Sequence, residues 1–121
     1  MKLLIVEDNA ATRQMIKRII APFAQQIVEC QDGVDACALY SVEQPDWVLM
    51  DIRLKDLDGI TATQQIRASY PNARIVIVTS FDEAGLREAA RRAGACGYVL
   101  KQNLPDLQRL FEGYEKERLK L

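Results

Sequence analysis

The chain contains an apolar run, Trp47–Met50, that ends on a single carboxylate, Asp51. Four consecutive apolar or aromatic residues are typical of a strand buried on both faces, as in the centre of a parallel sheet. Such a strand ends at the carboxyl edge of the sheet, where open α/β sheets bind their ligands. An Asp at that edge is either a turn former or a reactive group, and Asp51 alone does not distinguish the two.

Five strand-like segments alternate with five helix-like segments along the chain. The predicted strands cover residues 3–6, 27–30, 47–50, 75–78 and 98–100. This alternation predicts a parallel sheet with helices on both faces, which is a three-layer α/β fold. With 121 residues and neither a repeat nor a linker, the chain is expected to be a single domain, residues 1–121.

Capping residues and apolar spacing place the predicted helices. Asn9 is expected to cap the first helix, Ser80 or Asp82 the fourth, and Asn103 the fifth. Gly94 lies where a glycine would end the fourth helix. The apolar face of the first helix is expected to comprise Met15, Ile16, Ile19, Ile20 and Phe23.

Composition disfavours several classes of protein. The 16 Lys and Arg residues nearly balance the 17 Asp and Glu residues, so we expect no direct binding of nucleic acid. The sequence has no apolar run long enough to span a membrane and no signal peptide, so we expect a cytoplasmic protein without a membrane partner. Cys30, Cys37 and Cys96 are widely spaced and are expected to be reduced core residues. The chain has no His, which excludes His-based catalysis and His-ligated zinc.

Polar residues follow four of the five predicted strands. Glu7 and Asp8 follow the first strand, Asp51 the third, Thr79 the fourth and Lys101 the fifth. Because the ends of parallel strands lie along one edge of a sheet, these side chains are expected to converge on one crevice.

These residue types suit one chemistry. Clustered carboxylates repel by about 1 kcal/mol per pair in water and about 4 kcal/mol near a protein surface. A hard cation such as Mg²⁺ removes that repulsion and prefers oxygen ligands. A carboxylate can then attack phosphorus and form an acyl phosphate. Lys101 would supply a positive charge, and Thr79 a hydroxyl, to the phosphoryl oxygens.

Each of these residues also has an ordinary structural explanation. Glu7 and Asp8 could be acids that favour a helix N-terminus, and Thr79 is a β-branched residue suited to a strand end. Lys101 could simply be solvated. Their joint occurrence at one predicted edge favours the functional interpretation.

The sequence resembles the receiver domain of two-component response regulators, of the CheY-like superfamily. The resemblance is carried by LLIVEDN (3–9), LMDIRLKDLDG (49–59), IVIVTSF (75–81) and AGACGYVLK (93–101). It implies a flavodoxin-like winding with strand order 2-1-3-4-5. The stretch AGACGYVLKQNLPDL is similar to receivers of the LuxR/NarL-like class, which precede DNA-binding domains.

The resemblance implies that Asp51 is the phosphoacceptor. Mg²⁺ would be held by the side chains of Glu7, Asp8 and Asp51 and by the backbone carbonyl of Arg53. The donor would be a phosphohistidine on a sensor histidine kinase or phosphotransfer protein, consistent with a chain that contains no His. Such a chain is a regulator that assists its own phosphorylation and dephosphorylation and is not an enzyme.

The resemblance also implies a switch. Thr79 and Lys101 would contact the phosphoryl group, and Tyr98 would turn inward as Thr79 moves toward it. Arg53 and Phe81 would flank the site and control how water reaches the phosphoryl group. The surface of the fourth helix, fifth strand and fifth helix would change and be read by a partner, an output domain or a second copy.

A homodimer through this surface is one expectation. The fourth helix carries basic residues and the fifth carries acidic ones, so two copies could pair symmetrically. These residues are Arg87, Arg91 and Arg92 on the fourth helix and Asp106, Glu112, Glu115 and Glu117 on the fifth. The alternative is that both helices only present solvated faces.

Two positions depart from the family pattern. Lys55 stands where the family usually has a proline, so the loop after Asp51 is expected to be less restrained. Gln102 stands where a proline commonly follows the site lysine, and the Lys101–Gln102 peptide is expected to be trans. These departures leave open an alternative function, a pseudo-receiver that is never phosphorylated and acts as an interaction module.

Two other classes fit less well. A haloacid-dehalogenase-type phosphatase needs a second Asp two residues after the nucleophile, and Arg53 occupies that position. A nucleotide- or flavin-binding domain is disfavoured because neither GxGxxG nor GxxxxGK[ST] occurs in the chain.

Overall fold

The computed structural model describes residues 1–119. Its single sheet consists of β1 (Lys2–Val6), β2 (Gln26–Cys30), β3 (Trp47–Met50), β4 (Ile75–Thr79) and β5 (Gly97–Leu100). The helices are α1 (Ala10–Ile20), α2 (Gly33–Glu43), α3 (Gly59–Ser69), α4 (Ala84–Ala93) and α5 (Pro105–Leu119). Short 3₁₀ turns occur at Ala21–Phe23 and Lys101–Asn103.

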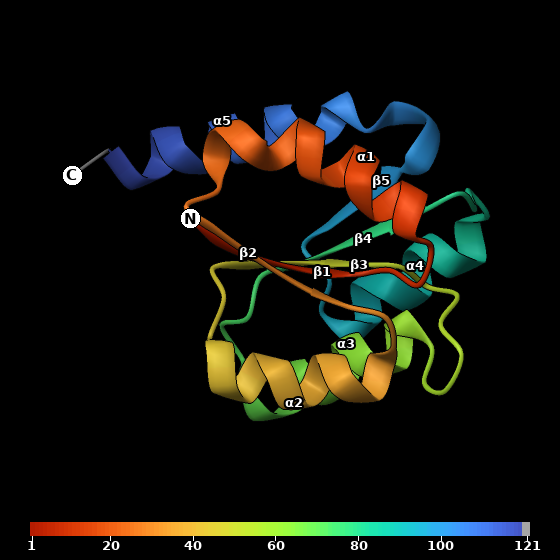
Figure 1. The fold of residues 1–121 in the computed structure, drawn as a ribbon. Helices are drawn as coiled ribbons and strands as arrows, with labels where there is room; N and C mark the ends of the chain where they lie inside the picture. The colour runs from red at the N-terminus through yellow and green to blue at the C-terminus, as the bar shows by residue number, and fades with distance from the viewer. Residues whose placement is uncertain (120–121) are drawn as a thin grey trace.

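All neighbouring strands are parallel, and their order is β2-β1-β3-β4-β5. Helices α1 and α5 cover one face of the sheet, and α2, α3 and α4 cover the other (Figure 1). The predicted three-layer fold with flavodoxin-like winding is therefore confirmed. No helix within residues 1–119 is long and apolar enough to cross a membrane.

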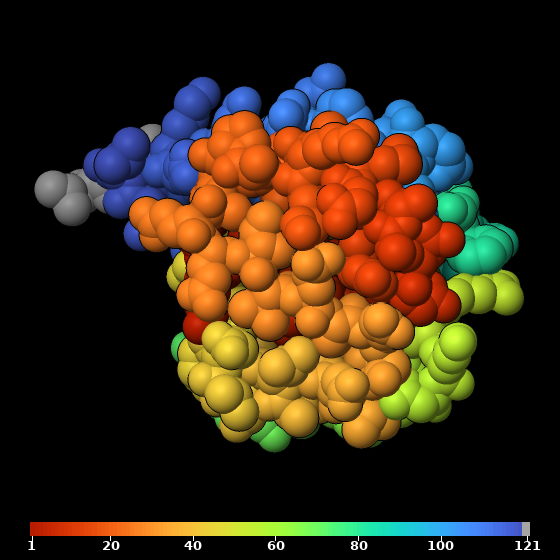
Figure 2. Space-filling model, in the orientation of Figure 1, coloured from red at the N-terminus to blue at the C-terminus, as the bar shows by residue number. Residues whose placement is uncertain are grey.

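The central strands are almost entirely apolar because each contributes to two cores. Leu49 packs with α1 and α5 on one face, whereas Val48 and Met50 pack with α2, α3 and α4 on the other. Every residue of β1 after Lys2, and every residue of β3 and β4, is buried. In the space-filling view, the side chains of α1, β2 and α2 form one face and leave little of β1 visible (Figure 2).

Two predicted helix boundaries are confirmed. Asn9 precedes α1, and its side chain accepts a hydrogen bond from the backbone N–H of Thr12. Gly94 ends α4 with φ 104°, a left-handed conformation that favours glycine.

The predicted caps of the fourth and fifth helices are wrong. Glu83 precedes α4 and makes no capping bond through its side chain. The carboxylate of Asp82 instead pairs with Arg87 at 2.6 Å. Asn103 is the last residue of a 3₁₀ turn, and Leu104 separates it from the first residue of α5.

The predicted environments of Met15 and two cysteines are also wrong. Ile16 and Ile20 face the sheet, whereas Met15 is 51% exposed because it lies to the side of this stripe. Cys30 is buried as expected, but Cys37 is only half-buried and Cys96 is exposed. All three thiols are free.

Candidate functional site

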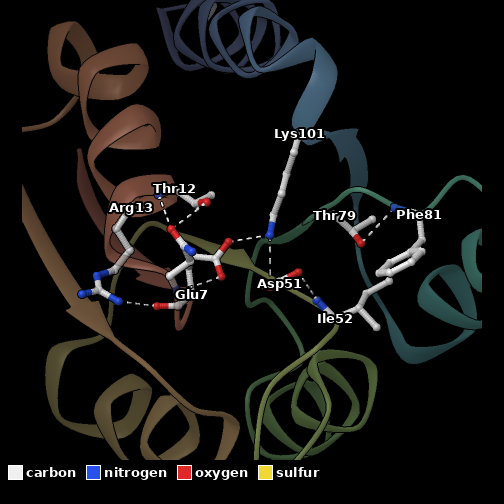
Figure 3. A network of polar contacts seen from close by, with 9 residues as sticks. Glu7, Thr12, Arg13, Asp51, Ile52, Thr79, Phe81 and Lys101 are labelled. Atoms are coloured by element: carbon white, nitrogen blue, oxygen red, sulfur yellow. Dashed lines mark hydrogen bonds and ion pairs between the residues drawn. The ribbon is translucent and has the colours of Figure 1, made fainter.

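The strand ends bring the predicted polar residues to one place. Residue Val6 of β1 is in register with Met50 of β3, and the backbone N–H of Asp51 donates to the carbonyl of Val6 at 3.0 Å. Figure 3 shows Glu7, Asp51, Thr79 and Lys101 around the same carboxyl edge.

Three carboxylates form the acidic part of the site. Oxygens of Glu7, Asp8 and Asp51 all lie within 4.8 Å of one another. Glu7 and Asp51 are only 1% and 6% exposed, whereas Asp8 is exposed. An oxygen-only set with one member open to water fits a hard divalent cation such as Mg²⁺, which retains water ligands.

Lys101 contacts both buried carboxylates. Its Nζ lies 2.6 Å from Oε1 of Glu7 and 3.2 Å from Oδ2 of Asp51. Burial alone would lower the pKa of Lys101, but the hydrogen bond to Glu7 and the charges of Asp51 and Glu7 raise it above its ordinary value. The ammonium group therefore stays charged. The peptide after Lys101 is trans, as predicted.

Glu7 is the most perturbed acid of the site. Burial, reinforced by the charge of Asp51, raises the pKa of Glu7 to about 7, and the contact with Lys101 only partly opposes this shift. Buried Oε1 lies 2.6 Å from the ammonium group of Lys101 and forms an ion pair with it. A bound cation would therefore oppose the effect of burial and favour the ionised form of Glu7.

The carboxylate of Asp51 is held from two sides. Its Oδ1 accepts a 2.8 Å hydrogen bond from the backbone N–H of Ile52, and its Oδ2 faces Lys101 (Figure 3). Beside it, the Arg53 guanidinium lies 4.3 Å from the centre of the Phe81 ring. The predicted flanking residues Arg53 and Phe81 therefore contact each other.

Phe81 connects Thr79 to Tyr98. The backbone N–H of Phe81 donates to the buried Oγ1 of Thr79 at 3.3 Å, and the Phe81 carbonyl accepts from the Tyr98 hydroxyl at 2.6 Å. Arg87 lies 4.5 Å from the centre of the Tyr98 ring and also pairs with Asp82. From the sequence, Arg87 was expected only to be part of a charged surface, because no pattern revealed its position over the Tyr98 ring.

The loop between β3 and α3 has restraints that the sequence did not reveal. Oδ1 of Asp56 accepts hydrogen bonds from the backbone N–H groups of Leu57 at 2.6 Å and Gly33 at 3.1 Å. A Cβ at Gly33 would lie 2.2 Å from the Leu57 carbonyl oxygen, and one at Gly59 would lie 1.8 Å from that of Asp51. Asp56 and the two glycines thus restrain the loop, although position 55 holds Lys where the family usually has a proline.

The basic residues of α4 are already paired within the chain. Glu88 accepts both Arg91 at 2.6 Å and Arg92 at 3.2 Å, and Asp106 pairs with Arg109 in α5. Symmetric pairing of two copies would have to compete with these contacts.

Comparison with known proteins identifies the family of the chain. Residues 3–112 match the family of response regulator receiver domains. The chain is 33% identical over 117 residues to the chemotaxis protein CheY of Listeria monocytogenes, and the match covers 96% of this chain and 97% of that protein. It is 39% identical over 101 residues to the transcriptional regulatory protein PdtaR of Mycobacterium tuberculosis, covering 83% of this chain and 49% of that protein.

Solved structures agree. A DNA-binding response regulator of the LuxR family from Staphylococcus aureus superimposes with a TM-score of 0.81 at 29% identity, covering 95% of this chain and 96% of that one. A LuxR-family regulator from an Aurantimonas species gives 0.82 at 32% identity, with coverages of 93% and 85%. The chain belongs to the family of response regulator receiver domains, which act in two-component signalling.

Proposed function

We propose that residues 1–121 form one cytoplasmic receiver domain that is switched by phosphorylation of Asp51. The phosphoryl group would come from a phosphohistidine on a sensor histidine kinase or phosphotransfer protein. The observation that carries this proposal is the position of Lys101, whose ammonium lies 2.6 Å from Glu7 and 3.2 Å from Asp51, beside a third carboxylate.

Each residue has a role in this transfer. A carboxylate oxygen of Asp51 forms the new bond to phosphorus as the phosphorus–nitrogen bond of the donor breaks. Lys101 then shifts toward the added phosphoryl oxygens. Glu7, Asp8, Asp51 and the carbonyl of Arg53 would hold Mg²⁺, which when bound neutralises the carboxylates and the phosphoryl oxygens.

The phosphoryl group would act on α4 through Thr79. When its hydroxyl turns toward the phosphate, Thr79 gives up the 3.3 Å bond from the Phe81 N–H. The Phe81 carbonyl, in the next peptide along the chain, holds Tyr98, so movement of Phe81 would release the ring. The surface formed by α4, β5 and α5 would then be read by a partner, an output domain or a second copy.

Arg53 and Phe81 would set the lifetime of the acyl phosphate. Their contact at 4.3 Å links the loops that follow β3 and β4. Opening of this contact would admit water to phosphorus, so the domain would assist its own dephosphorylation without being an enzyme.

A groove beside Lys101 would receive the protein donor. It has a volume of about 320 Å³ and is lined by Met15, Arg18 and Ile19 of α1 and by Leu104 and Pro105 at the start of α5. Exposed Met15 offers an apolar contact next to the site, and methionine adapts to varied partners.

Intact mass after incubation with acetyl phosphate tests the proposal. We expect one added phosphoryl group, only with Mg²⁺ present, and none in Asp51→Asn. No gain in mass under any condition would favour the alternative, a pseudo-receiver that serves as an interaction module.

A homodimer of the phosphorylated protein is a second proposal. Arg91 and Arg92 would exchange Glu88 for acidic residues on α5 of the second copy. Sedimentation should show a dimer that salt dissociates, whereas a phosphorylated monomer would contradict it.

A further inference from the structure

Arg13 reaches from α1 to the backbone of the loop that carries the acidic pair Glu7 and Asp8. Its Nη1 donates a 2.7 Å hydrogen bond to the carbonyl oxygen of Glu7 (Figure 3). Its Nε lies 3.3 Å from Oε1 of Glu29 on β2, and the Arg13 side chain is only 15% exposed. Glu29 is also paired with Lys17 at 3.1 Å, which holds it in place for Arg13.

The carbonyl of Glu7 belongs to the peptide that joins Glu7 to Asp8. The loop on either side is fixed by other bonds: the Glu7 N–H donates to the Cys30 carbonyl at 3.1 Å, and the Asn9 N–H donates to Oε2 of Glu7 at 3.3 Å. Arg13 therefore restrains the Glu7–Asp8 peptide, one of the two peptides that flank the Cα of Asp8, whereas the Asn9 N–H restrains the other.

Asp8 depends on this backbone restraint. Within the described chain, its carboxylate makes no hydrogen bond or ion pair that would orient it, although its oxygen lies within 4.8 Å of those of Glu7 and Asp51. Only the local backbone keeps that oxygen near the other two.

We propose that Arg13 is a positioning residue for a divalent cation, which acts by holding the Glu7–Asp8 peptide so that the three carboxylates meet. The inference rests on the magnesium site of the proposed function. Groups that orient metal ligands typically change metal affinity about 10–100-fold when they are removed.

Charge and geometry predict opposite effects for Arg13. If only its positive charge mattered, its removal would strengthen cation binding, because like charges repel. If it positions the peptide, its removal weakens binding. Arg13→Lys separates the two further, since it retains the charge but lacks the planar donors that bridge the Glu7 carbonyl and Glu29.

The test is calorimetric titration of the full chain with MgCl₂ at pH 8, where Glu7 is ionised. We expect the Mg²⁺ Kd to rise about 10-fold in Arg13→Ala and in Arg13→Lys. The matched control is Glu29→Gln, which removes the charge but keeps an amide oxygen that can accept from Nε of Arg13, and which retains the Arg13 bond to the Glu7 carbonyl. Its Kd should stay within about 2-fold of the wild-type value.

A second readout needs no metal. In the metal-free protein, amide hydrogen exchange at Asn9 should accelerate in Arg13→Ala and not in Glu29→Gln. If Arg13→Ala does not fold, Arg13→Lys carries both measurements.

Two results would overturn the inference, and they are distinguishable. Absence of Mg²⁺ binding by the wild-type chain would remove the magnesium site itself and the inference with it. Wild-type binding that both Arg13 variants retain, or strengthen, would overturn the positioning role alone and leave the proposed function intact.

Discussion

The hydroxyl of Tyr98 donates a 2.6 Å hydrogen bond to the backbone carbonyl of Phe81. This bond ties a half-buried ring on β5 to the residue that also donates to Thr79 through its N–H. A single residue thus connects the hydroxyl at the proposed phosphorylation site with the aromatic ring at the proposed output surface.

Tyr98→Phe should lower the free energy of unfolding by about 1 kcal/mol, because it removes one hydrogen bond and leaves the Phe81 carbonyl without its partner. Urea unfolding measures this change. Tyr70→Phe is the matched control, since it removes an exposed 3.0 Å bond to Ser41 and should cost less. Equal effects of the two variants would show that the Tyr98 bond contributes nothing special.

Stability should depend on pH through Glu7. In the metal-free folded protein the pKa of Glu7 is about 7, above its ordinary value of 4.5, so the folded state binds more protons than the unfolded state between these values. The contribution of Glu7 to the free energy of unfolding therefore falls, by up to about 3 kcal/mol, as pH rises from about 4.5 to about 7. Denaturation at pH 5 and pH 8 checks this.

Glu7→Gln is the control for that pH dependence. It removes the titrating group, so the difference in stability between pH 5 and pH 8 should shrink. Saturating Mg²⁺ at pH 8 should stabilise the wild type more than this variant, because the cation favours an ionised Glu7. An undiminished pH dependence in Glu7→Gln would assign the effect to another group.

Met15→Ala should slow phosphorylation by a phosphorylated phosphotransfer protein without changing the rate with acetyl phosphate. An apolar contact in a docking groove is worth about 1 kcal/mol or more, which corresponds to a loss of about 5- to 10-fold in kcat/KM. Val42→Ala is the control, because Val42 is 78% exposed on α2, which covers the opposite face of the sheet from α1. A similar loss with the phosphotransfer protein and with acetyl phosphate would show that Met15 affects the phosphoryl transfer itself and not the docking of the protein donor.

Gly59→Ala should destabilise the protein by about 1–3 kcal/mol or more, because the added Cβ would meet the Asp51 carbonyl and force a backbone shift. Gly113→Ala is the matched control. Nothing lies within 4 Å of a Cβ at Gly113, and alanine favours a helix over glycine, so this variant should gain up to about 1 kcal/mol. Thermal unfolding of both distinguishes steric overlap from helix propensity.

Much of the fold and site follows from local pattern. The apolar run before Asp51 requires burial on both faces, and parallel strands must bring Asp51 and Lys101 to one edge whatever the loop lengths. In the structure, Nζ of Lys101 lies 3.2 Å from Oδ2 of Asp51, as this pattern predicts.

The errors arise where one contact overrides a local preference. Asp82 is a good capping residue by type, but Arg87 occupies its carboxylate. Asn103 fails as a cap because the chain makes a 3₁₀ turn before α5. Arg13 and Asp56 were not identified because each binds a backbone atom outside its own element. Arg13 of α1 binds the Glu7 carbonyl in the preceding loop, and Asp56 binds the Gly33 N–H at the start of α2.

Helices α3 and α4, which follow β3 and β4, begin in contrasting ways. The start of α3 abuts the Asp51 backbone at Gly59, and Asp58 caps it by accepting from the Thr61 N–H. The start of α4 has no such side-chain cap, so fewer bonds must break before its first turn opens. We therefore expect α3 to be the stiffer support and α4 the more compliant one. If Asp51 is phosphorylated as proposed, the displacement should be taken up mainly at the start of α4, which would give it a direction before any partner binds.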